Sequence, residues 1–154
     1  MKRTLSSLAL AALVLIGSAA CTPEELKAAW RLNGYDYSHY SEADIQLLAF
    51  AITVNMREHA EMTKYNHVLS DAQLYRLRMC ESTNNYGAFN RAGPFYGAYQ
   101  FTQSTWNMVS SRHFGGRWYG VAPNTVPPGW QDAFTRALWA EQGRRPWPVC
   151  GLRV

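Results

Sequence analysis

The sequence predicts a mainly helical (α+β) protein with at most a small β element. Three stretches carry apolar residues at helical spacing, and each has a recognisable start signal or C-terminal stop signal. One short segment alternates aromatic and small residues as an extended strand does. We find no internal repeat and no low-complexity segment. The chain therefore fits one compact domain preceded by a helical segment.

The first predicted helix runs from Glu42 to about Met62. Ser41 and Asp44 have the spacing of a start signal, and apolar residues then recur at helical intervals. Its first half is apolar nearly all round, so it should pack on the downstream domain or on a partner. Residues 21–40 are mixed in composition and are expected to be a tether or a loosely docked segment. We therefore treat residues 21–67 as a tether with an accessory helix.

The second predicted helix begins at Ser70 and places one acid in an unusual position. Ser70 and Gln73 have the spacing of a capping box. Glu81 follows Leu74 by seven residues and Leu77 by four, so its carboxylate leaves the helix on the apolar side. Partial desolvation there would favour the neutral form and raise the pKa. A general acid at neutral pH needs that property.

Position alone leaves a second interpretation of Glu81 open. The side chain can instead point into solvent from a frayed last turn, or pair with Arg78. The remaining acids have ordinary explanations: Asp71 lies in a capping turn and Asp132 in the first turn of the last helix. Glu81 is therefore the best candidate for acid catalysis, with even odds from position alone.

The second half of the chain is predicted to hold one extended segment, a short helix and a final long helix. Turns flank Phe95 to Phe101, which alternates like a strand. Thr102 or Gln103 opens a helix through Val109, with Trp106 on its inner face. A loop to Pro128 follows, and the last helix runs to about Gln142 and stops at Gly143.

Other chemistries are disfavoured by the motifs that the sequence lacks. The four histidines show no HExxH or paired short spacing, and neither a Gly-x-Ser-x-Gly elbow nor a phosphate loop occurs. We therefore expect no metal ion and no cofactor. A cysteine nucleophile at Cys80 remains conceivable but is less favoured than a disulfide in an exported chain.

One set of motifs resembles the resuscitation-promoting factor (Rpf) family of actinobacteria. The match covers roughly Ser70 to Gly151. The motifs that carry it occur in the same order and at compatible separations; they are Cys80-Glu81-Ser82, Asn90, Tyr96-Gly97-Ala98-Tyr99-Gln100-Phe101, Thr105-Trp106 and Trp147-Pro148-Val149-Cys150.

The resemblance implies a small lysozyme-like fold over residues 68–154. It also implies cleavage of the β-1,4 bond between N-acetylmuramic acid and N-acetylglucosamine in peptidoglycan. Glu81 matches the catalytic glutamate, and Cys80 and Cys150 match a disulfide. The expected substrate contacts are Gln100, Thr105, Trp106, Tyr96, Tyr99 and Asn90. We expected Trp147 to be structural, and core packing is at least an equal expectation for Trp106.

The chain departs from the family pattern in ways that bear on sugar preference. Tyr86 stands where the family usually has Trp, and Ala98-Tyr99 replaces a Gly-Gly or Gly-Leu pair. The connection after Trp106 is also longer.

A lone acid fits a lytic transglycosylase better than an ordinary glycosidase, which uses two carboxylates. Glu81 would protonate the glycosidic oxygen and then deprotonate the C6 hydroxyl of the muramoyl residue, giving a 1,6-anhydro end. Plain hydrolysis of the muramidase type is the close alternative. A wall-binding or signalling module without turnover is the alternative from another class.

The first twenty residues read as a signal peptide for export. Lys2 and Arg3 precede an apolar run that is too short to span a bilayer stably. Cys21 follows the expected cleavage site and is a candidate for lipidation, since pairing of Cys80 with Cys150 leaves it the odd cysteine. Simple secretion of the same chain is the alternative. The expected location is outside the cell or at the outer face of its membrane and in the wall.

The charge balance excludes an ordinary nucleic-acid binder. The net charge is +4, and removal of Lys2 and Arg3 with residues 1–20 leaves 4 − 2 = +2. Nucleic-acid binders cluster their basic residues, whereas the arginines here are scattered. A mildly basic exported protein suits anionic wall polymers. We therefore expect peptidoglycan glycan strands as the partner and a monomer as the working state.

Overall fold

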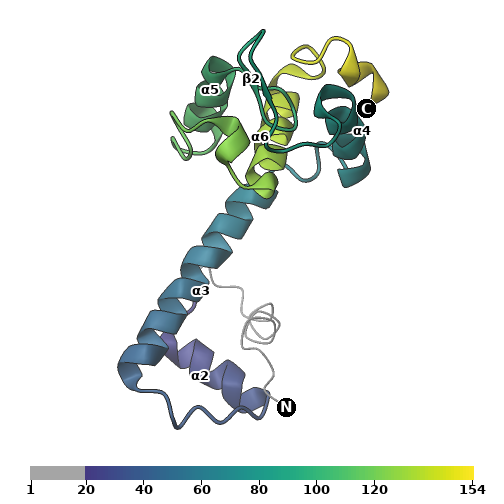
Figure 1. The fold of residues 1–154 in the computed structure, drawn as a ribbon. Coiled ribbons are helices and arrows are strands. Elements are labelled where there is room, and N and C mark those ends of the chain that lie inside the picture. The colour runs from purple at the N-terminus through teal and green to yellow at the C-terminus, as the bar shows by residue number, and fades with distance from the viewer. Residues whose placement is uncertain (1–19) are drawn as a thin grey trace. The chain divides into compact units, whose positions relative to one another are not determined.

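The computed structural model describes residues 20–154, which form two compact units. The first unit ends at Ala60, and the second spans Glu61–Val154 (Figure 1). The expected signal peptide, residues 1–20, lies outside the described residues except for Ala20. Within the described part of the chain, no helix combines the length and apolar character needed to cross a membrane.

The first unit contains a helix in the segment that we expected to be a tether or loosely docked. Helix α2 spans Pro23–Leu32, and α3 spans Glu42–Thr63, beginning at the predicted residue. The side chain of Thr22 accepts a hydrogen bond from the backbone N–H of Glu25, whose carboxylate bonds back to Thr22. This capping box, followed by proline at the first helical position, starts α2. The mixed composition of residues 21–40 did not indicate this helix.

Helices α2 and α3 share a small core of their own. Leu26 and Trp30 of α2 are buried together with Ile45 and Ala49 of α3. Cys21 belongs to this core with 5% of its surface exposed. Its backbone N–H donates to Thr53 Oγ1 at 2.8 Å. The residues just before α2 are thus part of a packed helical hairpin.

The second unit is mainly helical with one two-stranded sheet, which confirms the predicted fold class. Its long helices are α4 (Asp71–Ser82), α5 (Gln103–His113) and α6 (Pro128–Gln142). The short elements are β1 (Phe89–Asn90), β2 (Phe95–Tyr96) and the 3₁₀ turns η1 (Pro123–Thr125) and η2 (Cys150–Arg153). The strands are antiparallel, with Phe89 opposite Tyr96. This content suits the lysozyme-like arrangement that the resemblance implies.

The predicted helix ends are mostly confirmed. Ser70 caps α4 through the expected capping box with Gln73. Thr102 caps α5, which continues four residues beyond the expected end at Val109. Helix α6 ends at Gly143, which has a positive φ of 59° that glycine adopts without steric cost.

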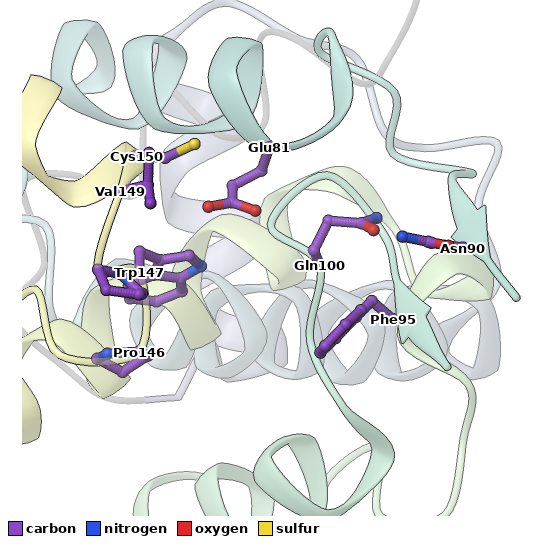
Figure 2. Close-up of a pocket in the computed structure, with 9 residues that line it drawn as sticks. Glu81, Asn90, Phe95, Gln100, Pro146, Trp147, Val149 and Cys150 are labelled. Carbon is purple, nitrogen blue, oxygen red and sulfur yellow. The ribbon is translucent and has the colours of Figure 1, made fainter. Parts of the chain in front are cut away.

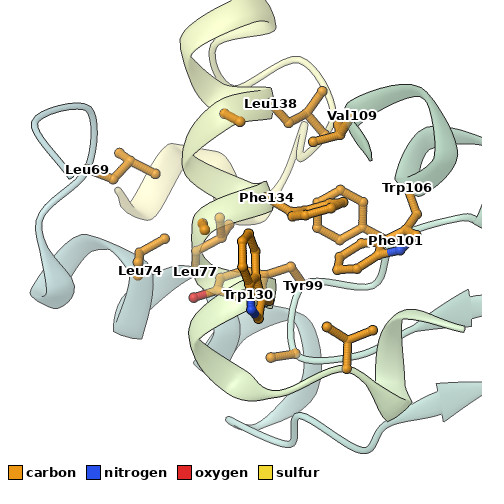
Figure 3. Packing of buried hydrophobic residues seen from close by; sticks show 14 of the residues in the cluster. Leu69, Leu74, Leu77, Tyr99, Phe101, Trp106, Val109, Trp130, Phe134 and Leu138 are labelled. Carbon is orange, nitrogen blue, oxygen red and sulfur yellow. The ribbon is translucent and has the colours of Figure 1, made fainter. Parts of the chain in front are cut away.

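Aromatic side chains around α6 form the core of this unit (Figure 3). Phe134 stacks on Trp106 of α5, with ring centroids 3.9 Å apart, and on Phe114 at 4.6 Å. Leu74 and Leu77 of α4 are fully buried in the same cluster. The apolar stripe predicted for α6 is thus the surface on which α4 and α5 pack.

The buried amide of Gln131 ties α6 to the chain around the sheet. Its Oε1 accepts the backbone N–H of Ala98 at 3.0 Å. Its Nε2 donates to the carbonyl oxygens of Tyr86, at 3.1 Å, and Val126, at 2.9 Å. Gln131 is 1% exposed, so each of these bonds also satisfies a polar group that water does not reach. Gly97 lies directly against this amide, where a Cβ atom would collide with Oε1.

Substitution of Gly97 by alanine should destabilise the second unit by about 2–4 kcal/mol. Gly97 has a φ of 76°, which alanine adopts poorly, and the added methyl would displace Gln131 from its bonds. Urea denaturation monitored by circular dichroism measures the loss. Gly87→Ala is the matched control, because a Cβ there makes only an ordinary contact at 3.5 Å. Equal stability of the two variants would show that the close approach of Gly97 to Gln131 does not contribute to the stability of the fold.

Candidate active site

A pocket of about 370 Å³ opens beside the C-terminal end of α4. Glu81 comes from α4, while Asn90, Phe95 and Gln100 come from the sheet and the turn after it (Figure 2). The opposite wall is residues 146–150. The Glu81 carboxylate points into the space between Trp147 and Gln100 (Figure 2). The volume is in the range of ligand-binding pockets.

A disulfide joins two walls of the pocket. Cys80 and Cys150 are bonded, with their Cα atoms 5.6 Å apart and a sequence separation of 70 positions. This confirms the pairing that the family resemblance implies. Closing a loop of that length stabilises the fold by about 4 kcal/mol in the chain-entropy model. Because Cys80 precedes Glu81 and Cys150 lines the pocket, the bond also fixes the acid against the opposite wall.

Glu81 is a half-buried acid whose carboxylate makes no hydrogen bond or ion pair within residues 20–154. Burial raises its pKa above the ordinary glutamate value of 4.5. It is also the one ionisable side chain among the nine residues that line the pocket. A proton held on this carboxyl would therefore face a site without a competing charge.

Arg78 does not pair with Glu81, because other groups engage its guanidinium. Its Nε donates to Asn84 Oδ1 at 2.6 Å, and Nη1 donates to the Tyr99 hydroxyl at 3.2 Å. Nη1 also lies 3.8 Å from Asp132 Oδ1. The alternative in which Arg78 pairs with Glu81 is therefore wrong.

Asp132 is the acceptor at the centre of this network. Its Oδ1 receives the hydroxyls of Tyr99, at 2.6 Å, and Tyr86, at 2.8 Å. Burial, followed by the nearby carboxylate, holds the pKa of both phenols well above the usual value, so both stay protonated as donors. The sequence suggested only a helix-dipole role for Asp132, and no local pattern in the sequence indicates these partners.

Two of the expected substrate contacts prove to be core residues. Tyr99 is 1% exposed and Trp106 is 0% exposed. Trp106 stacks on Phe134 and donates its indole N–H to the carbonyl oxygen of Trp118 at 3.0 Å. Neither ring has a free face for a sugar, so both are corrected from contact residues to residues that shape the core.

Gln100 and Asn90 do line the pocket, whereas Tyr96 and Thr105 do not belong to its lining. Tyr96 stacks on Phe89 in the sheet, at 4.8 Å between ring centroids, and Thr105 takes part in the capping of α5. Gln100 adopts a positive φ of 53° and donates its side-chain N–H to the carbonyl oxygen of Gly97 at 3.0 Å.

The sequence interpretation missed Phe95 and gave Trp147 only a structural role. Phe95 lines the pocket and is 37% exposed, and its ring lies over Gly93, where a Cβ atom would collide with it. Gly93 is the signal in the sequence that could have indicated this contact, because a residue without a Cβ atom lets an aromatic ring pack directly on the backbone. Trp147 is 4% exposed and donates to the carbonyl oxygen of Tyr99, yet part of it lines the pocket.

The pocket lies within a region that matches a known protein family. The family model described as "Transglycosylase-like domain" matches residues 69–150, more than half of the chain. The chain belongs to the transglycosylase-like domain family. This match also contains both cysteines of the disulfide and Glu81.

Two curated relatives of this transglycosylase-like chain support the Rpf resemblance. Resuscitation-promoting factor RpfA of Mycobacterium tuberculosis (strain CDC 1551 / Oshkosh) is 34% identical over 82 residues, which is 53% of this chain and 19% of RpfA. Resuscitation-promoting factor RpfB of Mycolicibacterium smegmatis is 33% identical over 78 residues, 51% of this chain and 20% of RpfB. The chain thus spans about a fifth of the length of these relatives. No solved structure matches it.

Replacing Glu81 by glutamine should stabilise the fold at neutral pH. A raised folded-state pKa means that the charged form is disfavoured in the folded protein, so the wild-type protein loses stability as pH rises past the ordinary pKa of 4.5. Glutamine avoids that cost. The advantage of Glu81→Gln should therefore be present at pH 7 and absent at pH 3.5, in urea titrations at both pH values.

The exposed Glu61 provides the matched control for this measurement. Glu61→Gln removes the same charge from a solvated position and should show a smaller difference between the two pH values. A Glu81→Gln variant that is less stable than wild type at pH 7 would contradict the idea that burying the charged Glu81 carboxylate destabilises the fold.

Proposed function

We propose that this chain cleaves the β-1,4 bond between N-acetylmuramic acid and N-acetylglucosamine in peptidoglycan, as a lytic transglycosylase. The observation that carries the proposal is the isolated, half-buried Glu81 in an otherwise uncharged pocket. The transglycosylase-like domain match over residues 69–150 supports the reaction class.

Glu81 is suited to act first as a general acid. Burial favours the protonated carboxyl, and no cation within the described residues pairs with it. In the first half of the reaction, its proton passes to the glycosidic oxygen while the bond from that oxygen to C1 of the muramoyl sugar breaks. The leaving sugar departs with a free hydroxyl group, and Glu81 remains as a carboxylate.

The second half of the reaction needs a nucleophile, and the substrate can supply it. A conventional retaining or inverting glycosidase has a second carboxylate at the site, but the pocket lining contains none besides Glu81. The C6 hydroxyl oxygen of the muramoyl residue attacks C1, and the Glu81 carboxylate accepts its proton. The product is a 1,6-anhydro ring, and Glu81 returns to its protonated state without net use of water.

The uncharged lining residues offer contacts that suit amino sugars. The side-chain amides of Gln100 and Asn90 can bond to acetamido and hydroxyl groups. The partly exposed ring of Phe95 and the accessible edge of Trp147 provide apolar surface on either side of the acid (Figure 2). Residues 68–154 then form the catalytic domain, and residues 21–67 an accessory segment.

Burial of Cys21 bears on how the protein is held outside the cell. A lipid joined to its sulfur would not fit inside the α2–α3 core, where Cys21 is 5% exposed. This packing supports simple secretion, whereas lipid anchoring would require Cys21 to leave the hairpin. A monomer acting on glycan strands in the wall suffices for the proposed reaction.

Glu81→Gln should lower the rate of peptidoglycan cleavage by about 10²–10⁴-fold, because it removes the transferable proton with little change in shape. Release of soluble fragments from purified peptidoglycan measures the rate. Glu61→Gln is the control and should retain the wild-type rate, since this exposed glutamate lies outside the pocket lining. A Glu81→Gln variant with native activity would overturn the assignment of the acid.

The products separate the proposed reaction from its alternatives. Mass spectrometry of the released fragments should show 1,6-anhydromuramoyl ends, which are lighter than hydrolytic ends by one water molecule. Reducing ends would instead identify a muramidase-type hydrolase using the same acid. Binding of wild-type protein to peptidoglycan without fragment release would indicate a wall-binding module.

A further inference from the structure

Positive charge is concentrated in the unit that contains the pocket. Residues 61–154 hold ten Lys and Arg against five Asp and Glu, an excess of 10 − 5 = +5. Residues 21–60 hold three against six, which gives 3 − 6 = −3. The modest net charge of the mature chain therefore conceals a strongly basic unit, and such an asymmetry points to an anionic partner for that unit.

The acids of the basic unit are mostly committed to partners of their own. Asp71 pairs with Arg136, Glu141 pairs with Arg112 and His113, and Asp132 accepts the two tyrosine hydroxyls near Arg78. Glu81 lies in the pocket. Few carboxylates are thus left to neutralise the remaining arginines.

Two of those arginines are the direct sequence neighbours of residues on opposite walls of the pocket. Arg91 directly follows Asn90, and Arg145 directly precedes Pro146; Asn90 and Pro146 both line the pocket. Both arginines are exposed, and neither side chain has a hydrogen-bond or ion-pair partner within the described residues. Each of the two opposite walls is therefore followed or preceded in sequence by one exposed arginine without a partner.

The backbone under each arginine is fixed. Asn90 Oδ1 accepts the N–H of Ala92 at 3.1 Å, which closes the turn that carries Arg91. The N–H of Trp147 donates to the carbonyl oxygen of Arg144 at 2.9 Å, and that of Arg145 to the carbonyl of Gln142 at 3.4 Å. Both charges are thus presented from ordered turns, which limits the entropy lost when they bind a ligand.

We propose that Arg91 and Arg145 bind carboxylates of the peptides attached to the muramoyl residues, and so select peptide-bearing glycan over bare glycan. The inference rests on the proposed function, because it assumes that a glycan strand occupies the Glu81 pocket. Guanidinium groups match carboxylates in a bidentate geometry.

The expected effect is on substrate binding, because the arginines do not touch the reacting bond. Arg91→Gln and Arg145→Gln should each raise KM for peptide-bearing strands roughly two- to fivefold, the range for exposed ion pairs, with kcat little changed. The double variant should combine the two effects. On glycan whose peptides have been removed by an amidase, both variants should match wild type.

The test compares these two substrates. Both are first freed of attached phosphate polymers, so that the peptide carboxylates are the anions by which the two substrates differ. Activity is measured at low and high salt, and wild type should lose its preference for peptide-bearing strands at high salt. Arg57→Gln is the matched control, since Arg57 is an exposed arginine of α3 in the other unit. Pelleting of Glu81→Gln protein with each insoluble substrate, with and without the two arginine changes, reports binding without turnover.

The outcomes separate this inference from the proposed function. Three results would overturn the role of Arg91 and Arg145 and leave the cleavage proposal standing. The arginine variants could bind both substrates equally less well, or show an unchanged KM on both. Alternatively, Arg57→Gln could raise KM as much as they do. If wild type releases no fragments, the cleavage proposal fails. The pelleting comparison still decides the peptide preference in that case: binding that is unaffected by the arginine changes refutes it.

Discussion

The polar side chains at the start of α6 are the constraint on which the candidate site depends. Gln131 holds the backbone of Tyr86, Ala98 and Val126, and the neighbouring Asp132 holds the hydroxyls of Tyr86 and Tyr99. One buried turn of helix thereby fixes the chain before and after the sheet. Buried polar groups are costly unless all are paired, so this arrangement admits few alternative positions for Asn90, Phe95 and Gln100.

The isolation of Glu81 follows from the same network. Arg78 lies one helical turn before the acid, at a spacing where a helix would allow an ion pair. Tyr99, Asn84 and Asp132 engage its guanidinium instead. An arginine against Glu81 would lower the pKa of its carboxyl, whereas burial without a cation raises it. The raised pKa of Glu81 thus comes from burial, and the partners of Arg78 keep a cation from lowering it.

Local patterns in the sequence were sufficient for most of the fold, and they indicated a candidate acid. Capping boxes, apolar spacing and the Gly143 stop located α3, α4 and α6, and family motifs indicated Glu81 and the Cys80–Cys150 bond. The errors have a physical cause: an aromatic residue in a motif can serve the core or the ligand, and only burial decides. Tyr99 and Trp106 proved to be core, while Phe95 was overlooked. The partners of Asp132 lie 33 and 46 residues away in sequence, so no local pattern reveals them.

A site with a single acid places an unusual demand on its surroundings. In the proposed reaction, the same carboxyl must hold a proton on binding and accept one later, so neither a strong cation nor a second carboxylate beside it would be tolerated. Neutral amides, an aromatic ring and a proline-rich wall meet that demand in the lining of this pocket. Hydrogen bonds of the Trp147 indole and backbone hold this wall, and the disulfide adjoining Glu81 adds a covalent constraint. Charge that binds an anionic strand must then come from outside the lining, and we propose as its source the exposed Arg91 and Arg145, which directly neighbour lining residues in sequence.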